Sequence, residues 1–242
     1  MLRMLYSILV NLLRLPKLVA QMHRMVDQPE NYSEQERYDY VRYLVSLMKK
    51  TGRIKTESFG HENLPVEGGY LLCPNHQGRY DAYSVVDVHE KPITVVMDRE
   101  MSYFVFVNEI IDVLRGKRMA LDDKRQSLRV INQVAQEVGE GRKYVIFPEG
   151  AYDDRKHNQL WDFKPGCFKA AVKAKAPIVP VALVDTYKVY NSRSLLPVKT
   201  QVHFLQPLSY EEYKDMNTHM ISDIVKARIE AKLEELGHKK SA

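Results

Sequence analysis

Two side chains five positions apart, His76 and Asp81, could do acid–base chemistry together. They follow the apolar run Tyr70–Pro74, which predicts the end of a buried strand. Catalytic groups of α/β sheets are often found where a strand ends and the chain turns into a helix. A histidine there can take a proton from an alcohol near neutral pH, and an aspartate can hold the ring and stabilise the imidazolium that forms.

The spacing of this pair sets a condition on the backbone. Five positions of a regular helix rotate the chain by about 500°, so the two side chains would diverge. They can meet only where residues 77–80 form a turn that leads into a helix. The chain has eight histidines, and a spacing of five to an aspartate also arises by chance. The pair alone therefore does not decide for catalysis.

Length, composition and charge limit the class of protein. The 242 residues suffice for one α/β domain or for a domain with a helical extension, and 45% apolar content is typical of a globular protein. Two cysteines, Cys73 and Cys167, provide neither a disulfide framework nor a four-ligand zinc site. The net charge of +5 suits an anionic membrane surface or a phosphorylated ligand. The basic residues are dispersed and match no nucleic-acid-binding motif, so we expect no nucleic-acid partner.

The first 25 residues form a largely apolar segment with a narrow polar stripe at helical spacing. A secretory signal would need an uninterrupted apolar core, and a spanning helix would carry Asn11, Arg14 and Lys17 at bilayer depth. We expect a helix in the membrane interface, kinked at Pro16, with its stripe among the headgroups and its apolar side in the acyl boundary. A helix packed on the protein's own body is the alternative. The stripe consists of Arg3, Ser7, Asn11, Arg14, Lys17 and Gln21.

A second helix is marked by its end signals. Ser33 and Glu36 match a capping box, and Gly52 follows the last turn as a stop. With the first helix it is expected to form a hairpin. We therefore expect residues 1–55 to be an N-terminal amphipathic two-helix membrane-docking element and residues 56–242 to be the α/β domain.

Beyond residue 60, short apolar runs alternate with helical patterns. The alternation predicts an α/β fold with a largely parallel sheet flanked by helices. Pro180, inside an apolar run, predicts an edge strand or a bulge. The expected strands are Tyr70–Cys73, Ile93–Met97, Tyr144–Phe147, Ile178–Val184 and Val202–Leu205, and the expected helices lie near Asp81–Val88, Ser102–Val113, Gln126–Val138, Cys167–Ala174 and Ser222–Leu236.

Four short blocks resemble the motifs of one enzyme family. They follow the N-H-x-x-x-x-D, F-P-E-G, F-K-x-G-x-F and V-P-V-[AI] patterns of the glycerolipid acyltransferases, the 1-acyl-glycerol-3-phosphate (lysophosphatidate) acyltransferase family. One block would be weak evidence, but four with sensible spacing are strong. The resemblance spans roughly residues 60–207, and the N-terminal helices resemble the family's membrane-docking element. The matching blocks are Asn75–Asp81, Phe147–Gly150, Phe163–Phe168 and Val179–Ala182.

The resemblance implies a reaction and its participants. A fatty acyl group would pass from an acyl thioester, acyl-CoA or acyl carrier protein, to the free hydroxyl of a lysophospholipid. The acceptor implied is 1-acyl-glycerol-3-phosphate, and the product is phosphatidic acid. His76 would act as general base, and Asp81 would orient its ring. Because the thioester is already activated, we expect no cofactor and no metal. We also expect the chain at the cytoplasmic face of the cell membrane, attached through residues 1–50.

The resemblance further implies that Glu149 and Gly150 help to bind the glycerol-phosphate portion of the acceptor. Two departures leave the acceptor headgroup open. The family commonly has E-G-T-R where this chain has Ala151-Tyr152, and a block that commonly ends in Asp-Arg differs at residues 121–125. The usual phosphate-reading arginines are thus absent or displaced. The candidates for binding the anion are Arg118 and Lys164, then Lys124 and Arg125, which are equally interpreted as surface charges.

Two other functions stay open from the sequence. A metal-dependent hydrolase could use His76, Asp81 and the acidic and histidine side chains of residues 153–157, although that segment is simpler to interpret as a polar loop. The displaced arginines also allow an acyltransferase-like lipid-binding protein, or an enzyme that acts on a different acceptor.

Overall fold

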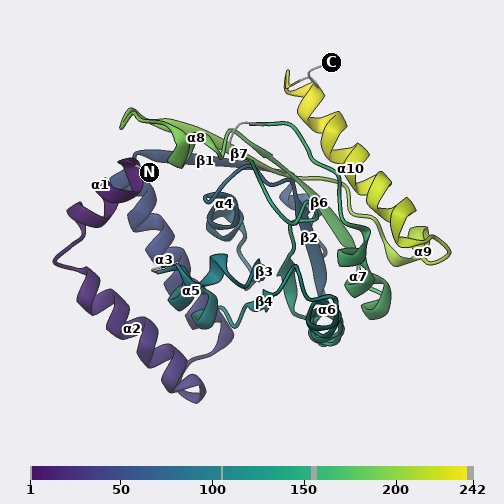
Figure 1. Cartoon of the computed structure of the whole chain (residues 1–242), viewed down its shortest axis with the longest axis horizontal. Helices are drawn as coiled ribbons and strands as arrows, with labels where there is room; N and C mark the ends of the chain where they lie inside the picture. Colours follow the sequence, from purple (N-terminus) through teal and green to yellow (C-terminus); the bar gives the residue numbers. More distant parts are fainter. Residues whose placement is uncertain (1, 105, 154–156, 239–242) are drawn as a thin grey trace.

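The computed structural model describes residues 2–104, 106–153 and 157–238, and its centre is a seven-stranded sheet (Figure 1). The strand order is β1-β7-β6-β2-β5-β3-β4, and every neighbouring pair is parallel except β6 and β7. The prediction of a largely parallel sheet is confirmed. The strands are β1 (Ile54–Phe59), β2 (Tyr70–Pro74), β3 (Thr94–Asp98), β4 (Lys117–Met119), β5 (Lys143–Val145), β6 (Ile178–Val184) and β7 (Val198–Phe204).

Helices cover both faces of the sheet, and alternate residues of each central strand pack into two cores. In β2, Tyr70 and Leu72 contact the core built with α2 to α5, whereas Leu71 and Cys73 contact the core built with α6, α7 and α10. The helices are α1 (Leu2–Val10), α2 (Leu15–Asp27), α3 (Glu34–Gly52), α4 (Asp81–Val88), α5 (Val107–Val113), α6 (Lys124–Gly139), α7 (Lys169–Ala174), α8 (Lys188–Asn191), α9 (Tyr210–Tyr213) and α10 (Thr218–Glu235).

Pro180 lies in an interior strand, so the edge-strand alternative is wrong. β6 pairs with β2 on one side and β7 on the other, and all seven of its residues are buried. Pairing on the β7 side runs from Ile178 opposite Leu208 to Val181 opposite Phe204, so one strand contributes an extra residue between these pairs. This is the geometry of a bulge, which tolerates a residue without an N–H.

The polar stripe of α1 faces the protein body, contrary to the prediction that it lies among headgroups. Arg3 is 1% exposed, and Ser7 and Asn11 are also buried. The Arg3 guanidinium donates to the carbonyl of Val189 at 3.1 Å and to three further carbonyls. Carbonyls at the end of a helix lack intrahelical donors and can accept such hydrogen bonds. The apolar side of the helix is left outside. The exposed residues of this face and the following turn are Leu2, Leu5, Tyr6, Leu9, Val10, Leu12 and Leu13.

The N-terminal segment forms three helices where the sequence predicted two. α1 ends at Val10, and α2 begins at Leu15 with Pro16 in its first turn, so the expected kink is a complete break. The capping box that starts α3 is confirmed, with both Ser33–Glu36 hydrogen bonds formed. Within the described ranges, no helix combines the length and the apolar character that crossing a bilayer requires.

Candidate active site

The predicted catalytic pair lies at the carboxyl edge of the parallel strands. β2 ends at Pro74 and α4 begins at Asp81, and His76 lies in the connection between them. The connection turns as the spacing required, and His76 Nδ1 lies 2.7 Å from Asp81 Oδ2. The loop that follows β5 reaches the same edge, since β5 pairs with β2 in parallel.

The surroundings of Asp81 fix the proton position on the imidazole. Asp81 is fully buried, and its Oδ2 also accepts the backbone N–H groups of Gln77 and Gly78, the latter at 2.8 Å. Because backbone N–H groups can only donate, Oδ2 acts as an acceptor, and we assign Nδ1–H of His76 as the third donor to it. Nε2 is then the unprotonated nitrogen, which is the one that a general base needs.

The imidazole of His76 is held between two aromatic rings. Its centre lies 4.1 Å from the centre of the Phe147 ring, in a stacked arrangement, and 4.6 Å from that of Tyr152. The side chain keeps 18% of its surface exposed. Nε2 makes no hydrogen bond to any residue that the structure describes. The ring is thus fixed in orientation while its basic nitrogen stays accessible.

Asn75 and Gln77, which the sequence did not single out as functional, fasten the histidine loop to β6. The Asn75 amide exchanges two hydrogen bonds with the backbone of Leu183, at 2.7 and 3.1 Å. Gln77 donates to the same carbonyl at 2.7 Å and accepts from the hydroxyl and the backbone N–H of Thr186. Both amides are 1% exposed. Their position on either side of His76 was the available signal.

Glu149 braces the backbone around the pair. Its Oε1 accepts the N–H of His76 at 2.7 Å, and its Oε2 accepts the N–H of Trp161 at 2.9 Å. The residue is 2% exposed. Burial raises the pKa of Glu149 to about 7, although the two N–H donors oppose the shift. Both carboxylate oxygens are thus used within the protein, which favours positioning over direct contact with a ligand.

Gly150 adopts a conformation that a side chain would disturb. Its φ is +70°, and a Cβ at this position would come within 2.7 Å of Lys164 Nζ. The Gly150 N–H bonds to the Phe147 carbonyl at 3.1 Å, which closes the turn. Lys164 therefore lies directly over this turn, and it lines the same cavity as His76.

The other predicted anion-binding residues do not all line the cavity that contains His76. Arg118 donates to Ser102, Asn108 and Asp112, the last at 2.6 Å, and does not line the cavity of His76. Arg125 is exposed and also lies outside that cavity, whereas Lys124 lines it. Of the four predicted anion-binding residues, Lys164 and Lys124 share a cavity with His76.

That cavity, called here the apolar cavity, has a volume of about 1740 Å³ and extends from His76 beneath the N-terminal helices. Pockets for drug-sized ligands are commonly about 300–1,000 Å³, so this one suits a longer molecule. Its walls are mostly aliphatic and aromatic, and the charged residues among them are Arg79, Asp98, Lys124, Asp153, Lys164 and Lys169. Lining residues from the helices include Ile8, Leu18, Met22, Leu44, Met48, Val86, Ile110 and Leu128.

The part of the chain that the structure describes contains no preformed metal-binding site. No group of three or more His, Cys, Asp or Glu side chains is arranged to hold an ion among those residues. Residues 154–156, which belong to the segment considered for a metal-dependent hydrolase, lie outside the described residues.

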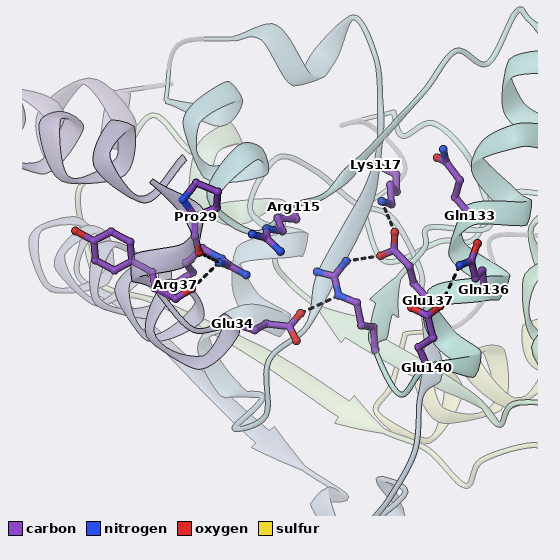
Figure 2. A pocket seen from close by; sticks show the side chains of 11 residues that line it. Pro29, Glu34, Arg37, Arg115, Lys117, Gln133, Gln136, Glu137 and Glu140 are labelled. Atoms are coloured by element: carbon purple, nitrogen blue, oxygen red, sulfur yellow. Dashed lines mark hydrogen bonds and ion pairs between the residues drawn. The ribbon is translucent and has the colours of Figure 1, made fainter. Parts of the chain in front are cut away.

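A second cavity, of about 690 Å³, is polar and lies at the edge where β4 and β5 begin, opposite the histidine (Figure 2). Arg142 lies between Glu34 of α3, at 2.8 Å, and Glu137 of α6, and Lys117 also contacts Glu137. Figure 2 shows Glu34 on one side of the cavity and Glu137 with Lys117 on the other. The network links α3 to α6 and to the edge of the sheet.

The sequence is similar to those of known proteins. A Caenorhabditis elegans relative is 28% identical over 156 residues, which are 63% of this chain and 54% of that protein, so the chain spans about half of its length. The 1-acyl-sn-glycerol-3-phosphate acyltransferase of Saccharomyces cerevisiae is 25% identical over 201 residues, 79% of this chain and 64% of that enzyme.

The fold is shared with a solved structure. The crystal structure of the 1-acyl-sn-glycerophosphate acyltransferase PlsC from Thermotoga maritima superposes with a TM-score of 0.76 at 18% identity and covers 100% of this chain and 97% of that one. The sequence profile of the acyltransferase family matches residues 55–184, more than half of the chain and the part that carries His76, Asp81 and Glu149. The chain belongs to the acyltransferase family.

Proposed function

We propose that this protein transfers a fatty acyl group from an acyl thioester, acyl-CoA or acyl carrier protein, to the free hydroxyl of a lysophospholipid. The acceptor that we propose is 1-acyl-glycerol-3-phosphate, which gives phosphatidic acid. The observation that carries the proposal is an imidazole bonded to a buried carboxylate at 2.7 Å, at one end of a long apolar cavity.

The steps follow from the chemistry of the pair. Nε2 of His76 takes the hydroxyl proton as the acceptor oxygen attacks the thioester carbon, and Asp81 stabilises the imidazolium. Collapse of the tetrahedral intermediate breaks the carbon–sulfur bond, and the imidazolium returns the proton to the departing thiolate. The products are an ester and a free thiol. Such base catalysis contributes about 10²–10⁴ in rate, and holding both lipids in one cavity supplies further acceleration.

The exposed apolar surface of the N-terminal segment supports a function at a membrane. The outward apolar face of α1 and the turn after it exposes six leucine and valine residues with Tyr6, and Leu13 is 96% exposed. Exposed apolar surface of this kind suits the acyl boundary of a bilayer. The same helices contribute to the lining of the apolar cavity, and we propose that a lipid passes along them from the bilayer to the histidine. We propose peripheral attachment at the cytoplasmic face of the membrane.

The test uses purified protein, acyl-CoA or acyl carrier protein thioesters, and a panel of lysolipids presented in vesicles. Release of free thiol identifies the donor, and the mass of the lipid product identifies the acceptor. We expect phosphatidic acid from 1-acyl-glycerol-3-phosphate. Hydrolysis of the thioester without an acylated lipid, or no consumption of any thioester, would contradict the proposal and favour a lipid-binding role.

A further inference from the structure

Arg79 belongs to the histidine block, yet the reaction described above gives it no role. It lies in the turn that Asp81 holds through backbone N–H groups, and it lines the apolar cavity together with His76 and Lys164. The residue is exposed. A guanidinium and the base therefore line the same cavity.

Two aromatic residues set the direction of this guanidinium. Arg79 Nε donates to the Tyr152 hydroxyl at 3.3 Å, and its central carbon lies 5.6 Å from the centre of the Phe104 ring. Tyr152 also packs on the His76 imidazole, with ring centres 4.6 Å apart. One tyrosine therefore contacts both the base and the cation.

The charge of the residues that line the cavity suits an anion. Arg79 and three lysines line it, against two acidic side chains. One of the acids, Asp98, is engaged with the N–H of Met101 at 3.0 Å. A planar guanidinium offers paired donors that match phosphate oxygens, which a lysine cannot do. The lysines are Lys124, Lys164 and Lys169, and the acids are Asp98 and Asp153.

We propose that Arg79 binds the phosphate of the lysophospholipid acceptor and that Tyr152 is a positioning residue for its guanidinium. The inference rests on the proposed acyl transfer and names the group that selects the acceptor. It also accounts for Tyr152 after Glu149-Gly150, where the similar family commonly has an arginine: here the cation comes from the histidine block and lies against the tyrosine.

The kinetic test compares Arg79→Gln, Arg79→Lys and Tyr152→Phe on two acceptors with one acyl chain, 1-acyl-glycerol-3-phosphate and neutral monoacylglycerol. In Arg79→Gln we expect KM for the phosphate acceptor to rise about tenfold or more, because a charge-assisted pair is lost, with kcat nearly unchanged. KM for monoacylglycerol should stay the same. Arg79→Lys should lose less, and Tyr152→Phe about threefold. Arg129→Gln, an exposed arginine of α6 outside the cavity, is the matched control.

A binding test keeps this inference separate from the proposed reaction. Binding of 1-acyl-glycerol-3-phosphate is measured in His76→Ala with and without Arg79→Gln, with inorganic phosphate and CoA as competitors. We expect the second substitution to weaken binding about tenfold. Equal binding overturns the inference, as does a rise in KM for acyl-CoA alone, which would assign Arg79 to the donor. A wild-type protein that binds through Arg79 but never acylates would refute the reaction and leave the anion site standing.

Discussion

At the scale of single residues, the proposed chemistry depends on Nε2 of His76. Removal of the imidazole in His76→Ala should lower the rate of thiol release by about 10²–10⁴, because no other histidine lines the cavity among the described residues. Asp81→Asn should also lower it by about 10² or more, since an amide no longer stabilises the imidazolium. The measurement is single-turnover thiol release with a fixed acceptor.

The fold of both variants must be checked, because Asp81 also accepts two backbone N–H groups. Circular dichroism and thermal melting supply the comparison with the wild type. Turnover by a folded His76→Ala variant at the wild-type rate would remove the histidine from its assigned role.

Glu149 links stability to pH at the same site. Burial raises its pKa to about 7 from an ordinary value of 4.5, so the folded state retains a proton that the unfolded chain has released. The resulting stabilisation is complete below pH about 4.5 and is lost as pH rises through about 7. Because each tenfold change in an acid's dissociation constant corresponds to about 1.4 kcal/mol, the loss amounts to about 3 kcal/mol. Urea unfolding at pH 5 and pH 8 measures it.

The variant Glu149→Gln isolates this contribution from the other titrating groups. The free energy of unfolding of the wild type, minus that of Glu149→Gln, should fall by about 3 kcal/mol between the two pH values. Glu30→Gln changes an exposed carboxylate and is the control. If the difference in free energy of unfolding between the wild type and Glu149→Gln is the same at both pH values, the carboxyl group of the folded protein is already ionised at pH 5.

At the scale of elements, Arg142 in the polar cavity links α3 to α6 and to the start of β5. Its guanidinium bridges Glu34 and Glu137, and 18% of the side chain is exposed. Arg142→Met leaves both carboxylates without this partner and should lower the free energy of unfolding by about 2 kcal/mol, measured in urea. Lys214→Met breaks an exposed pair with Glu211 and should cost below about 0.5 kcal/mol. Equal losses would show that the bridge adds no stability.

The elements that the sequence predicted well are those with strong local signals. β6 and α4 match the expected bounds, because one is a continuous apolar run and the other starts at a polar residue after a turn. β1 and β4 were missed. They lie at the two edges of the sheet, and β4 consists of Lys117-Arg118-Met119, whose composition carries no strand pattern. Their pairing with distant strands, and not their own residues, makes them strands.

Some contacts of the candidate site could likewise be predicted from the sequence, and others could not. The meeting of His76 with Asp81 followed from spacing once a turn was assumed, since both lie in one connection. The partners of Asn75 lie more than a hundred positions away, and the contact of Arg79 with Tyr152 depends on the parallel pairing of β2 with β5. Such contacts exist only after the strands are ordered in the sheet, so no local pattern reveals them.

At the scale of the whole molecule, the inverted orientation of α1 decides how the protein could meet a membrane. A helical moment in the sequence shows that one side is polar, but it does not say which side the protein covers. Here Arg3 is satisfied by carbonyls of the body, so the leucine side is presented outward, above the apolar cavity. In the proposed function, membrane docking and substrate entry would then use the same face.

The apolar face of α1 and the turn after it can be tested against an exposed apolar residue elsewhere, Met220, which is 49% exposed. Leu9 and Leu13 are 67% and 96% exposed, and each would gain about 1 kcal/mol on half burial in a bilayer. The double variant Leu9→Glu with Leu13→Glu should therefore bind phosphatidylcholine–phosphatidylglycerol vesicles about thirtyfold or more weakly in sedimentation, with an unchanged circular dichroism spectrum. Met220 lies on α10, at the opposite side of the molecule from α1 and α2 (Figure 1), and Met220→Glu should bind like the wild type. Equal loss in both proteins would mean that added negative charge, and not this face, controls attachment.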